Sequence, residues 1–307
     1  MTKVLIATEK PFAKVAVDGI KAILNEEGFE LTLLEGYTDR SKLLKAVADV
    51  DAMIVRSDKI DKQVAEAASK LKIVVRAGAG YDNLDLESLK FHGVVAMNTP
   101  GQNSNAVVEL VIGLMIMMAR NKYNGKAGVE LRGKTVGIHG YGNIGRILGQ
   151  VLNGMGMDVY CYSVPAQDKE QLAQVGVTVV DSLEELFEKC QYVSTHVPAN
   201  EHTKGCLNYD LVKRMPKGGT LINTARKELI DEDGLLKLLA EREDFQYVAD
   251  VMPEKADEFN KFADRVLFTP KKMGAQTAEA NINAGLKAAR QIVAYLLNGD
   301  TTHQLNK

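Results

Sequence analysis

The sequence has little cysteine, no excess of one charge and no long hydrophobic run, and each absence excludes a class of protein. Only three cysteines occur in 307 residues, Cys161, Cys190 and Cys206, and no two form a Cys-x-x-Cys pair. So sparse and odd a set predicts reduced, buried thiols and a cytoplasmic location. The formal net charge of −2 argues against a nucleic-acid partner, which would require a basic face.

The sequence also supports neither a membrane-spanning segment nor a metal site. The most apolar run, Val107–Ala119, is interrupted by Glu109 and Gly113 and is too short to span a membrane. The chain begins directly as a strand, without a signal-peptide hydrophobic region. The five histidines form no metal-ligand pattern. We therefore expect a cytoplasmic protein of about two domains, with no membrane, nucleic-acid or metal partner.

The most informative motif is a glycine-rich turn between an apolar run, Thr135–His139, and a segment of helical spacing, Arg146–Asn153. A G-x-G-x-x-G turn in this context is typical of dinucleotide binding. Gly140 makes the tight turn, Gly142 lets a pyrophosphate approach the backbone, and Gly145 lets the helix pack close to the strand. The helix N-terminus offers free N–H groups to the phosphates. The alternative is a glycine-rich turn in some other α/β protein.

Continuous apolar runs alternate with amphipathic segments along most of the chain, and this alternation predicts parallel sheets covered on both faces. In the first hundred residues the apolar runs are Val4–Ala7, Leu31–Leu34, Ala52–Val55, Ile73–Val75 and Val94–Met97. After a long helix, Ser104–Arg120, a second series comprises Thr135–His139, Asp158–Cys161, Thr178–Val180, Tyr192–Thr195, Thr220–Asn223, Tyr247–Asp250 and Val266–Phe268.

The expected fold class is therefore α/β, with two doubly wound parallel-sheet domains. The last helix, about Ala278–Leu297, has no strand after it and is expected to return to the first domain. We expect a flavodoxin-like substrate domain over residues 1–100 and 278–307. A dinucleotide-binding (Rossmann) domain is expected over residues 101–277, with ligands in an interdomain cleft.

Several motifs in a fixed order resemble those of the D-2-hydroxyacid dehydrogenase family, and the similarity is strongest to its short phosphoglycerate dehydrogenases. The matching blocks are Arg76–Asn83, Asn98–Pro100, Glu130–Thr135, the glycine turn, Thr195–Pro198, Asn223–Arg226 and Ala249–Val251. The resemblance implies an NAD-dependent oxidoreductase that acts on a small anionic 2-hydroxy acid. The expected reaction is hydride transfer between C2 of 3-phosphoglycerate and NAD, which gives 3-phosphohydroxypyruvate and opens serine biosynthesis.

Two alternatives remain open at this point. One is another D-2-hydroxyacid dehydrogenase, such as a hydroxypyruvate or glyoxylate reductase. The other is a non-catalytic NAD-sensing protein, as some family members are. The resemblance also implies a homodimer formed through the helix at Val107–Arg120.

The resemblance identifies Arg226 as the catalytic arginine, whose planar guanidinium can hold the substrate carboxylate and C2 oxygen together. The family's acid/base is a histidine in a Thr-Pro-His block, but here that block contains two lysines. Alignment from Met273–Ala275 puts Lys272 in the histidine's place, and alignment from Pro270 puts Lys271 there. We assign Lys272, because the sequence downstream then continues the family pattern without a gap.

A lysine base would need its pKa to fall from ~10.4 toward ~7–8 to act at neutral pH. Desolvation and the neighbouring charges of Arg226 and Lys271 would favour this fall, whereas a carboxylate would oppose it. Glu254 is the candidate for the family's catalytic glutamate, although it comes one residue earlier than the family spacing. It either contacts Lys272 or is a solvated loop carboxylate.

The resemblance also implies residues for the cofactor. They are Gly140, Gly142, Asn143, Ile144, Gly145, Ser163, His196, Val197, Pro198, Thr203, Thr224, Ala225 and Asp250. Ser163 occupies the position where NAD-preferring members carry an acidic residue for the ribose hydroxyls, and no arginine follows directly to hold a 2′-phosphate. NAD therefore remains the expected cofactor. Asp250 either receives the nicotinamide carboxamide or is a structural carboxylate.

Substrate residues are expected in the first domain. Backbone N–H groups of Gly78, Ala79 and Gly80 can form an anion nest, where the resemblance places the substrate carboxylate. Arg56-Ser57 follows one strand and Arg76 ends another. Two arginines could bind a distal phosphate through forked donors, and the alternative is that both face solvent.

Overall fold

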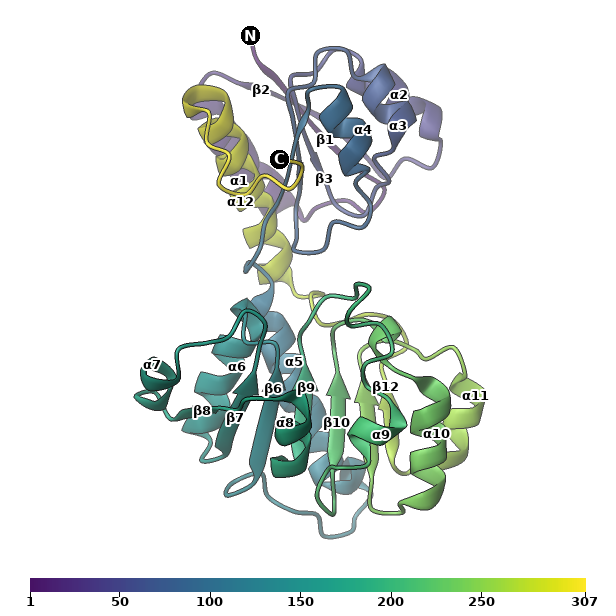
Figure 1. The fold of residues 1–307 in the computed structure, drawn as a ribbon. Coiled ribbons are helices and arrows are strands. Elements are labelled where there is room, and N and C mark those ends of the chain that lie inside the picture. Colours follow the sequence, from purple (N-terminus) through teal and green to yellow (C-terminus); the bar gives the residue numbers. More distant parts are fainter. The chain divides into compact units, whose positions relative to one another are not determined.

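The computed structural model describes residues 1–307, and the chain divides into two compact units, each built on one parallel sheet (Figure 1). The first unit comprises Met1–Asn103 and Gln276–Lys307, and the second comprises Ser104–Ala275. The five-stranded sheet has the order β2-β1-β3-β4-β5, and the seven-stranded sheet has the order β12-β11-β10-β9-β6-β7-β8. The prediction of an α/β protein with two doubly wound parallel sheets is therefore confirmed.

In the first unit, four of the five strands have side chains buried on both faces of the sheet, whereas the edge strand Glu30–Glu35 has no fully buried residue. The strands are β1 (Lys3–Thr8), β2 (Glu30–Glu35), β3 (Ala52–Val55), β4 (Ile73–Arg76) and β5 (Val95–Asn98); the helices are α1 (Lys14–Glu26), α2 (Arg40–Val47), α3 (Lys62–Ala67), α4 (Leu86–Phe91) and α12 (Ala278–Asn298). Along β1, Val4 and Ile6 pack with α1 and α12, whereas Leu5 and Ala7 pack with the other three helices. This double burial explains the continuous apolar runs.

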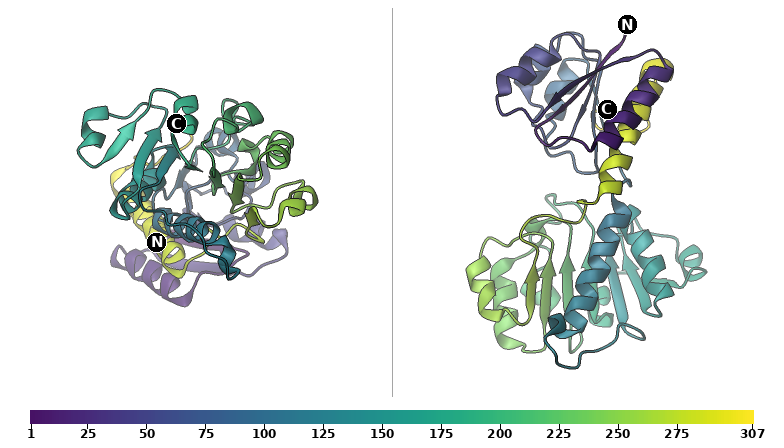
Figure 2. Two further views of the ribbon diagram at one scale, coloured as in Figure 1. Left: turned by 90° about the horizontal axis from the view of Figure 1, so that it is seen from below. Right: turned by 180° about the vertical axis from the view of Figure 1, so that it is seen from behind.

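The final helix belongs to the first unit, where α12 lies beside α1 on one face of the sheet (Figure 2). The tail after it reaches the edge strand β5. Leu305 N–H donates to the carbonyl of Ala96 at 2.9 Å. The Asn306 amide accepts from Ala96 N–H at 3.0 Å and donates to the carbonyl of Val94 at 2.8 Å. These bonds occupy backbone groups of an otherwise unpaired sheet edge.

The second unit carries helices on both faces of its seven strands. The strands are β6 (Thr135–His139), β7 (Asp158–Tyr162), β8 (Val177–Val179), β9 (Tyr192–Thr195), β10 (Thr220–Asn223), β11 (Gln246–Ala249) and β12 (Val266–Phe268). The α-helices are α5 (Ser104–Ala119), α6 (Asn143–Gly154), α7 (Lys169–Ala173), α8 (Leu183–Lys189), α9 (Tyr209–Val212), α10 (Glu232–Glu241) and α11 (Ala256–Phe259). Three 3₁₀ turns, η1 (Asn121–Tyr123), η2 (Lys227–Leu229) and η3 (Asn260–Phe262), complete the unit.

No helix of the structure combines the length and the apolar character needed to cross a membrane. No cluster of three or more histidine, cysteine or carboxylate side chains is arranged to hold a metal ion.

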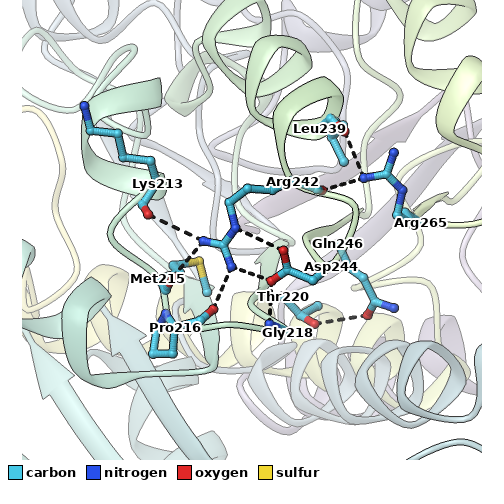
Figure 3. A network of polar contacts seen from close by, with 10 residues as sticks. All are labelled: Lys213, Met215, Pro216, Gly218, Thr220, Leu239, Arg242, Asp244, Gln246 and Arg265. Carbon is cyan, nitrogen blue, oxygen red and sulfur yellow. Dashed lines mark hydrogen bonds and ion pairs between the residues drawn. The ribbon is translucent and has the colours of Figure 1, made fainter.

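At the amino ends of β10, β11 and β12, an arginine network ties the connecting loops together (Figure 3). Arg242 donates to the carbonyls of Met215 and Pro216 at 2.7 and 2.9 Å and to the carboxylate of Asp244 at 2.6 Å. Its hydrogen-bonded guanidinium lowers the pKa of Asp244 to about 2. Arg265 donates to the carbonyls of Leu239 and Arg242 at 2.9 and 2.7 Å. The network therefore stabilises the sheet at its amino edge.

We expect Arg242→Met to lower the free energy of unfolding by about 3 kcal/mol, because the carbonyls of Met215 and Pro216 lose a charged donor. Urea unfolding at neutral pH measures this change. Arg214→Met is the matched control. Arg214 forms an exposed ion pair with Glu188, and its loss should cost under about 1 kcal/mol. Equal effects of the two substitutions would contradict the role given to the network.

Candidate active site

The glycine turn between β6 and α6 has the geometry that a dinucleotide requires. Gly140 adopts a φ of +94°, in the left-handed region that favours glycine. A side chain at Gly145 would place its Cβ 2.4 Å from the carbonyl oxygen of Gly140, so glycine is needed for the helix to pack against the turn. At Gly142 nothing lies within 4 Å of where a Cβ would be, and no side chain caps α6. Open space therefore faces the uncapped helix N-terminus, which suits a pyrophosphate.

We expect Gly142→Ala to weaken NADH binding by about tenfold or more while leaving the unfolding midpoint unchanged. The φ of −86° at Gly142 suits alanine, but the new methyl group would occupy the space available to a phosphate. Fluorescence titration with NADH and thermal unfolding measure the two effects. In the contrasting variant, Gly145→Ala, the unfolding midpoint should fall. Unchanged NADH affinity in Gly142→Ala would contradict the site.

Buried polar atoms after β9 and β10 lie at the same edge of the sheet. His196 Nε2 lies 2.9 Å from Ser194 Oγ, and the His196 backbone N–H donates to the carbonyl of His139 at 2.7 Å. His196 Nδ1 and Thr224 Oγ1 are buried and have no hydrogen-bond partner. Buried polar atoms are normally satisfied, so both are suited to meet polar groups of a bound cofactor.

Two other predicted cofactor residues, Val197 and Thr203, lie in the loop after β9 and make contacts within the protein. Thr203 Oγ1 donates to the carbonyl of Pro198 at 2.6 Å and accepts from the N–H of Asn200 at 2.9 Å. A Cβ at Gly140 would lie 2.8 Å from Val197 Cγ1, so this loop packs directly on the glycine turn. The hydroxyl of Thr203 is therefore engaged within its own turn.

Burial affects the titration of both histidines near the glycine turn. Desolvation lowers the pKa of His139 to about 4 and that of His196 to about 3. The unfolded chain has ordinary histidines, with pKa near 6.5. Between these values the unfolded state binds more protons, so acid destabilises the fold below about pH 6.5.

We expect the free energy of unfolding to be lower at pH 5 than at pH 7.5, by roughly 2 kcal/mol through His139 alone. Urea unfolding at both pH values measures the loss. His139→Gln should reduce the pH dependence, because glutamine does not titrate. His202→Gln is the control, since the His202 side chain is 84% exposed. A pH dependence that His139→Gln leaves unaltered would contradict this explanation.

The end of β7 lies next to the glycine turn, because Gly140 N–H donates to the carbonyl of Tyr162 at 2.8 Å. Ser163 follows directly. From the first turn of α6, Arg146 reaches Gln167 with an Nη2–Oε1 distance of 3.3 Å. The structure thus brings Ser163 to the predicted cofactor site.

Two candidate catalytic cations meet at one carbonyl oxygen. The oxygen of Ala225 accepts from Arg226 Nη1 at 3.1 Å and from Lys272 Nζ at 2.8 Å. The buried side chain of Asn223 holds this turn after β10: it accepts from Ala225 N–H at 3.0 Å and donates to the carbonyl of Arg226 at 2.8 Å. A guanidinium and an amine are therefore placed side by side at this turn.

Glu254 is paired with a different lysine. Its carboxylate accepts from Lys227 Nζ at 2.7 Å, and its side chain is 73% exposed. The hydrogen bond from Lys227 lowers the pKa of Glu254. These features are those of a solvated loop carboxylate, and a catalytic contact with Lys272 stays a prediction.

In the first unit, the turn after β4 differs from the predicted three-residue nest. Gly78 N–H donates to Thr99 Oγ1 at 2.6 Å, so it is not available to a ligand. The N–H groups of Ala79 and Gly80 have no hydrogen-bond partner in the structure. Arg76 packs on this turn: a Cβ at Gly78 would lie 1.4 Å from Arg76 Nη1. An anion could therefore use two backbone donors next to the Arg76 guanidinium.

The Arg56 side chain is partly buried, and its donors are engaged within the first unit rather than forming an open fork. Its Nη1 donates to the carbonyls of Lys10 and Pro11 at 2.9 and 3.1 Å, and its Nη2 donates to Asn281 Oδ1 at 2.5 Å. The guanidinium also lies 5.2 Å from the ring centre of Phe12. Arg56 thus joins the β1–α1 loop to α12, while the neighbouring Ser57 is exposed.

Comparison with known proteins identifies the family. Residues 111–271, more than half of the chain, match the model described as "D-isomer specific 2-hydroxyacid dehydrogenase, NAD binding domain". D-3-phosphoglycerate dehydrogenase of Methanocaldococcus jannaschii is 35% identical over 90% of this chain, which spans only 55% of that protein's length. Hydroxypyruvate reductase of Thermotoga maritima is 33% identical, over 95% of this chain and 98% of that protein.

A solved structure agrees with these relatives. The NAD⁺-bound 3-phosphoglycerate dehydrogenase of Entamoeba histolytica is 44% identical, with a TM-score of 0.89 over 100% of this chain and 99% of the other. The expected resemblance to this family is thereby confirmed. The chain belongs to the D-isomer specific 2-hydroxyacid dehydrogenase family, and residues 111–271 form its NAD-binding domain.

Proposed function

We propose that this chain catalyses the NAD-dependent oxidation of D-3-phosphoglycerate to 3-phosphohydroxypyruvate, and the reverse reduction. The observation that carries the proposal is the meeting of Arg226 Nη1 and Lys272 Nζ at the carbonyl oxygen of Ala225. Two cationic donors a few ångströms apart suit a substrate with a carboxylate and an adjacent hydroxyl. The 44% identity to a 3-phosphoglycerate dehydrogenase supports the choice of substrate.

In this proposal, Arg226 binds the substrate carboxylate and the C2 oxygen through its planar fork and stabilises the negative charge that develops on that oxygen. Lys272, as the neutral amine, accepts the proton of the C2 hydroxyl, and as the ammonium it returns the proton during reduction. NAD, when bound, supplies the carbon that accepts the hydride from C2. Open space at Gly142 and the unpaired atoms of Thr224 and His196 support its binding.

The anionic groups of the substrate have further candidate donors in the first unit. We assign the N–H groups of Ala79 and Gly80, and the guanidinium of Arg76 packed beside them, to substrate binding. Arg56 would support this region indirectly, because its donors hold the β1–α1 loop and α12.

The second candidate is oxidation of non-phosphorylated D-glycerate, the reverse of hydroxypyruvate reduction. Two observations favour it: Arg56 is engaged in structural bonds, and the hydroxypyruvate reductase is matched over 98% of its length.

NADH formation from 3-phosphoglycerate and from D-glycerate separates the two candidates. We expect kcat/KM to favour 3-phosphoglycerate by about 100-fold, since charge-assisted hydrogen bonds to a phosphate contribute about 1.5–3 kcal/mol each. Equal values for the two acids would overturn the phosphate assignment and favour the second candidate. A parallel assay with NADP tests the cofactor, and a large preference for NADP would overturn NAD.

A homodimer formed through α5 is part of the same proposal. The partly exposed side chains of Ile112 and Ile116 flank exposed Gly113 on this helix, and a closely approaching second copy could cover them. Sedimentation equilibrium should give twice the 33.6 kDa mass of the chain. A monomer at micromolar concentration would contradict the homodimer. The cytoplasmic location of the protein stays a prediction.

A further inference from the structure

The carboxylate of Asp250 is engaged by the loop that carries Lys272. Asp250 directly follows β11 and is completely buried. Its Oδ1 accepts from Thr269 Oγ1 at 2.8 Å and from Met273 N–H at 2.6 Å, and its Oδ2 accepts from Gly274 N–H at 2.7 Å. One carboxylate therefore binds both ends of the segment from Thr269 to Gly274.

Two further features show that this arrangement is specific. Thr269 N–H donates to the carbonyl of Ala249 at 3.1 Å, so the loop begins in register with β11. A Cβ at Gly274 would lie 2.9 Å from Asp250 Oδ2, so a side chain at this position would press on the carboxylate. The close approach of the backbone to Asp250 thus depends on glycine at the end of the loop.

Lys272 lies one residue before the anchored N–H of Met273, and its Nζ reaches the carbonyl oxygen of Ala225 where Arg226 also donates. The position of the amine is therefore set at two points, the backbone next to it and the tip of its side chain. Only the first point involves Asp250. Loss of the carboxylate would free the loop while leaving the turn at Ala225 intact.

We propose that Asp250 is a positioning residue that fixes the loop of residues 269–274 and thereby holds the Lys272 amine beside Arg226. This inference rests on the proposed function, in which Lys272 is the acid/base. This role is distinct from the expected contact of Asp250 with the nicotinamide carboxamide, which stays a prediction, since the three bonds to the loop leave one acceptor position of the carboxylate unused.

Steady-state kinetics of Asp250→Asn test the proposal. An amide has only one acceptor oxygen, so at least one loop N–H faces an NH₂ group. We expect kcat with 3-phosphoglycerate to fall about 100-fold through misplacement of the amine, with the Kd for NADH unchanged within about twofold. A raised Kd for NADH with kcat unchanged at saturation would overturn the proposal and assign Asp250 to the cofactor.

Thr269 provides a milder pair of variants if Asp250→Asn does not fold. Thr269→Val removes one bond to Asp250 and should lower kcat about fivefold, whereas Thr269→Ser keeps the hydroxyl and should restore kcat to nearly the wild-type value. Equal kcat in the two variants would contradict positioning through this bond.

A double-mutant cycle with Lys272→Met separates positioning from an independent role. If Asp250 acts only through Lys272, adding Asp250→Asn to Lys272→Met leaves the residual kcat unchanged within about twofold. Independent effects would multiply and overturn the proposal.

If the wild-type protein oxidises no hydroxy acid, the proposed function fails, and acylation of Lys272 followed by peptide mass spectrometry still tests the positioning. Asp250→Asn should then bring the labelling of Lys272 closer to that of Lys271, and an unchanged ratio would overturn the proposal.

Discussion

Lys272→Met should lower kcat for oxidation of 3-phosphoglycerate by about 10³-fold, within the usual 10²–10⁴ range for a general base. Methionine preserves much of the side-chain length but can neither accept nor donate a proton. Because the base must be the neutral amine, the wild-type oxidation rate should rise toward alkaline pH, and the variant should lose this rise. Initial rates of NADH formation across pH measure both effects.

Lys271→Met is the matched control, since Lys271 is the adjacent exposed lysine and carries the same charge. It should retain kcat within about threefold, because loss of a nearby surface charge alters the site only weakly. If Lys271→Met instead loses activity and Lys272→Met does not, the acid/base role belongs to Lys271.

Arg226→Lys should lower kcat/KM by about 10³-fold, although the charge is retained. Lysine presents a point charge on a flexible stem and cannot bridge the carboxylate and the C2 oxygen as a planar fork does. Because the contact to the C2 oxygen strengthens as charge develops there, most of the loss should fall on kcat. Steady-state kinetics with 3-phosphoglycerate provide the measurement.

Arg214→Lys makes the same chemical change at the exposed pair with Glu188 and should leave kcat/KM within about twofold. A loss confined to KM in Arg226→Lys would contradict transition-state stabilisation by Arg226 and would favour simple binding of the carboxylate.

The sheets and the glycine turn could be predicted from sequence because their signals are local. Continuous apolar runs coincide with every strand. In the glycine turn, Gly140 has a positive φ, Gly145 has no room for a Cβ, and Gly142 faces open space. Four of the five shortest helices, α4, α7, α9 and α11, were not predicted individually. With four to six residues each, they are too short for hydrophobic periodicity to develop.

The contacts of site residues were less predictable, because they depend on partners distant in sequence. Nothing near Arg56 indicates that its guanidinium binds Asn281, 225 residues away. The N–H of Gly78 is taken by Thr99 after the next strand. A strand-end aspartate such as Asp250 suits both a cofactor and a structural role, and nothing near it in the sequence indicates its bonds to Thr269, Met273 and Gly274.

The proximity of Arg226 and Lys272 could be predicted only in part. Arg226 follows β10 and Lys272 follows β12 of the same parallel sheet, and the carboxyl ends of parallel strands lie at one edge of the sheet. Their meeting at the oxygen of Ala225 depends on the side chain of Asn223 and on the anchored loop after β12. The Asn223–Arg226 block indicates the family, but it does not indicate the bonds that the Asn223 side chain makes.

Direct transfer of hydrogen from C2 to the nicotinamide is the central claim, and 3-phosphoglycerate deuterated at C2 tests it. After incubation with NAD and the wild-type protein, mass spectrometry of the reduced nucleotide should show one deuterium per molecule formed. The protein should also form 3-phosphohydroxypyruvate in equal amount. Absence of reduced nucleotide, or reduced nucleotide without deuterium, would contradict hydride transfer by this chain.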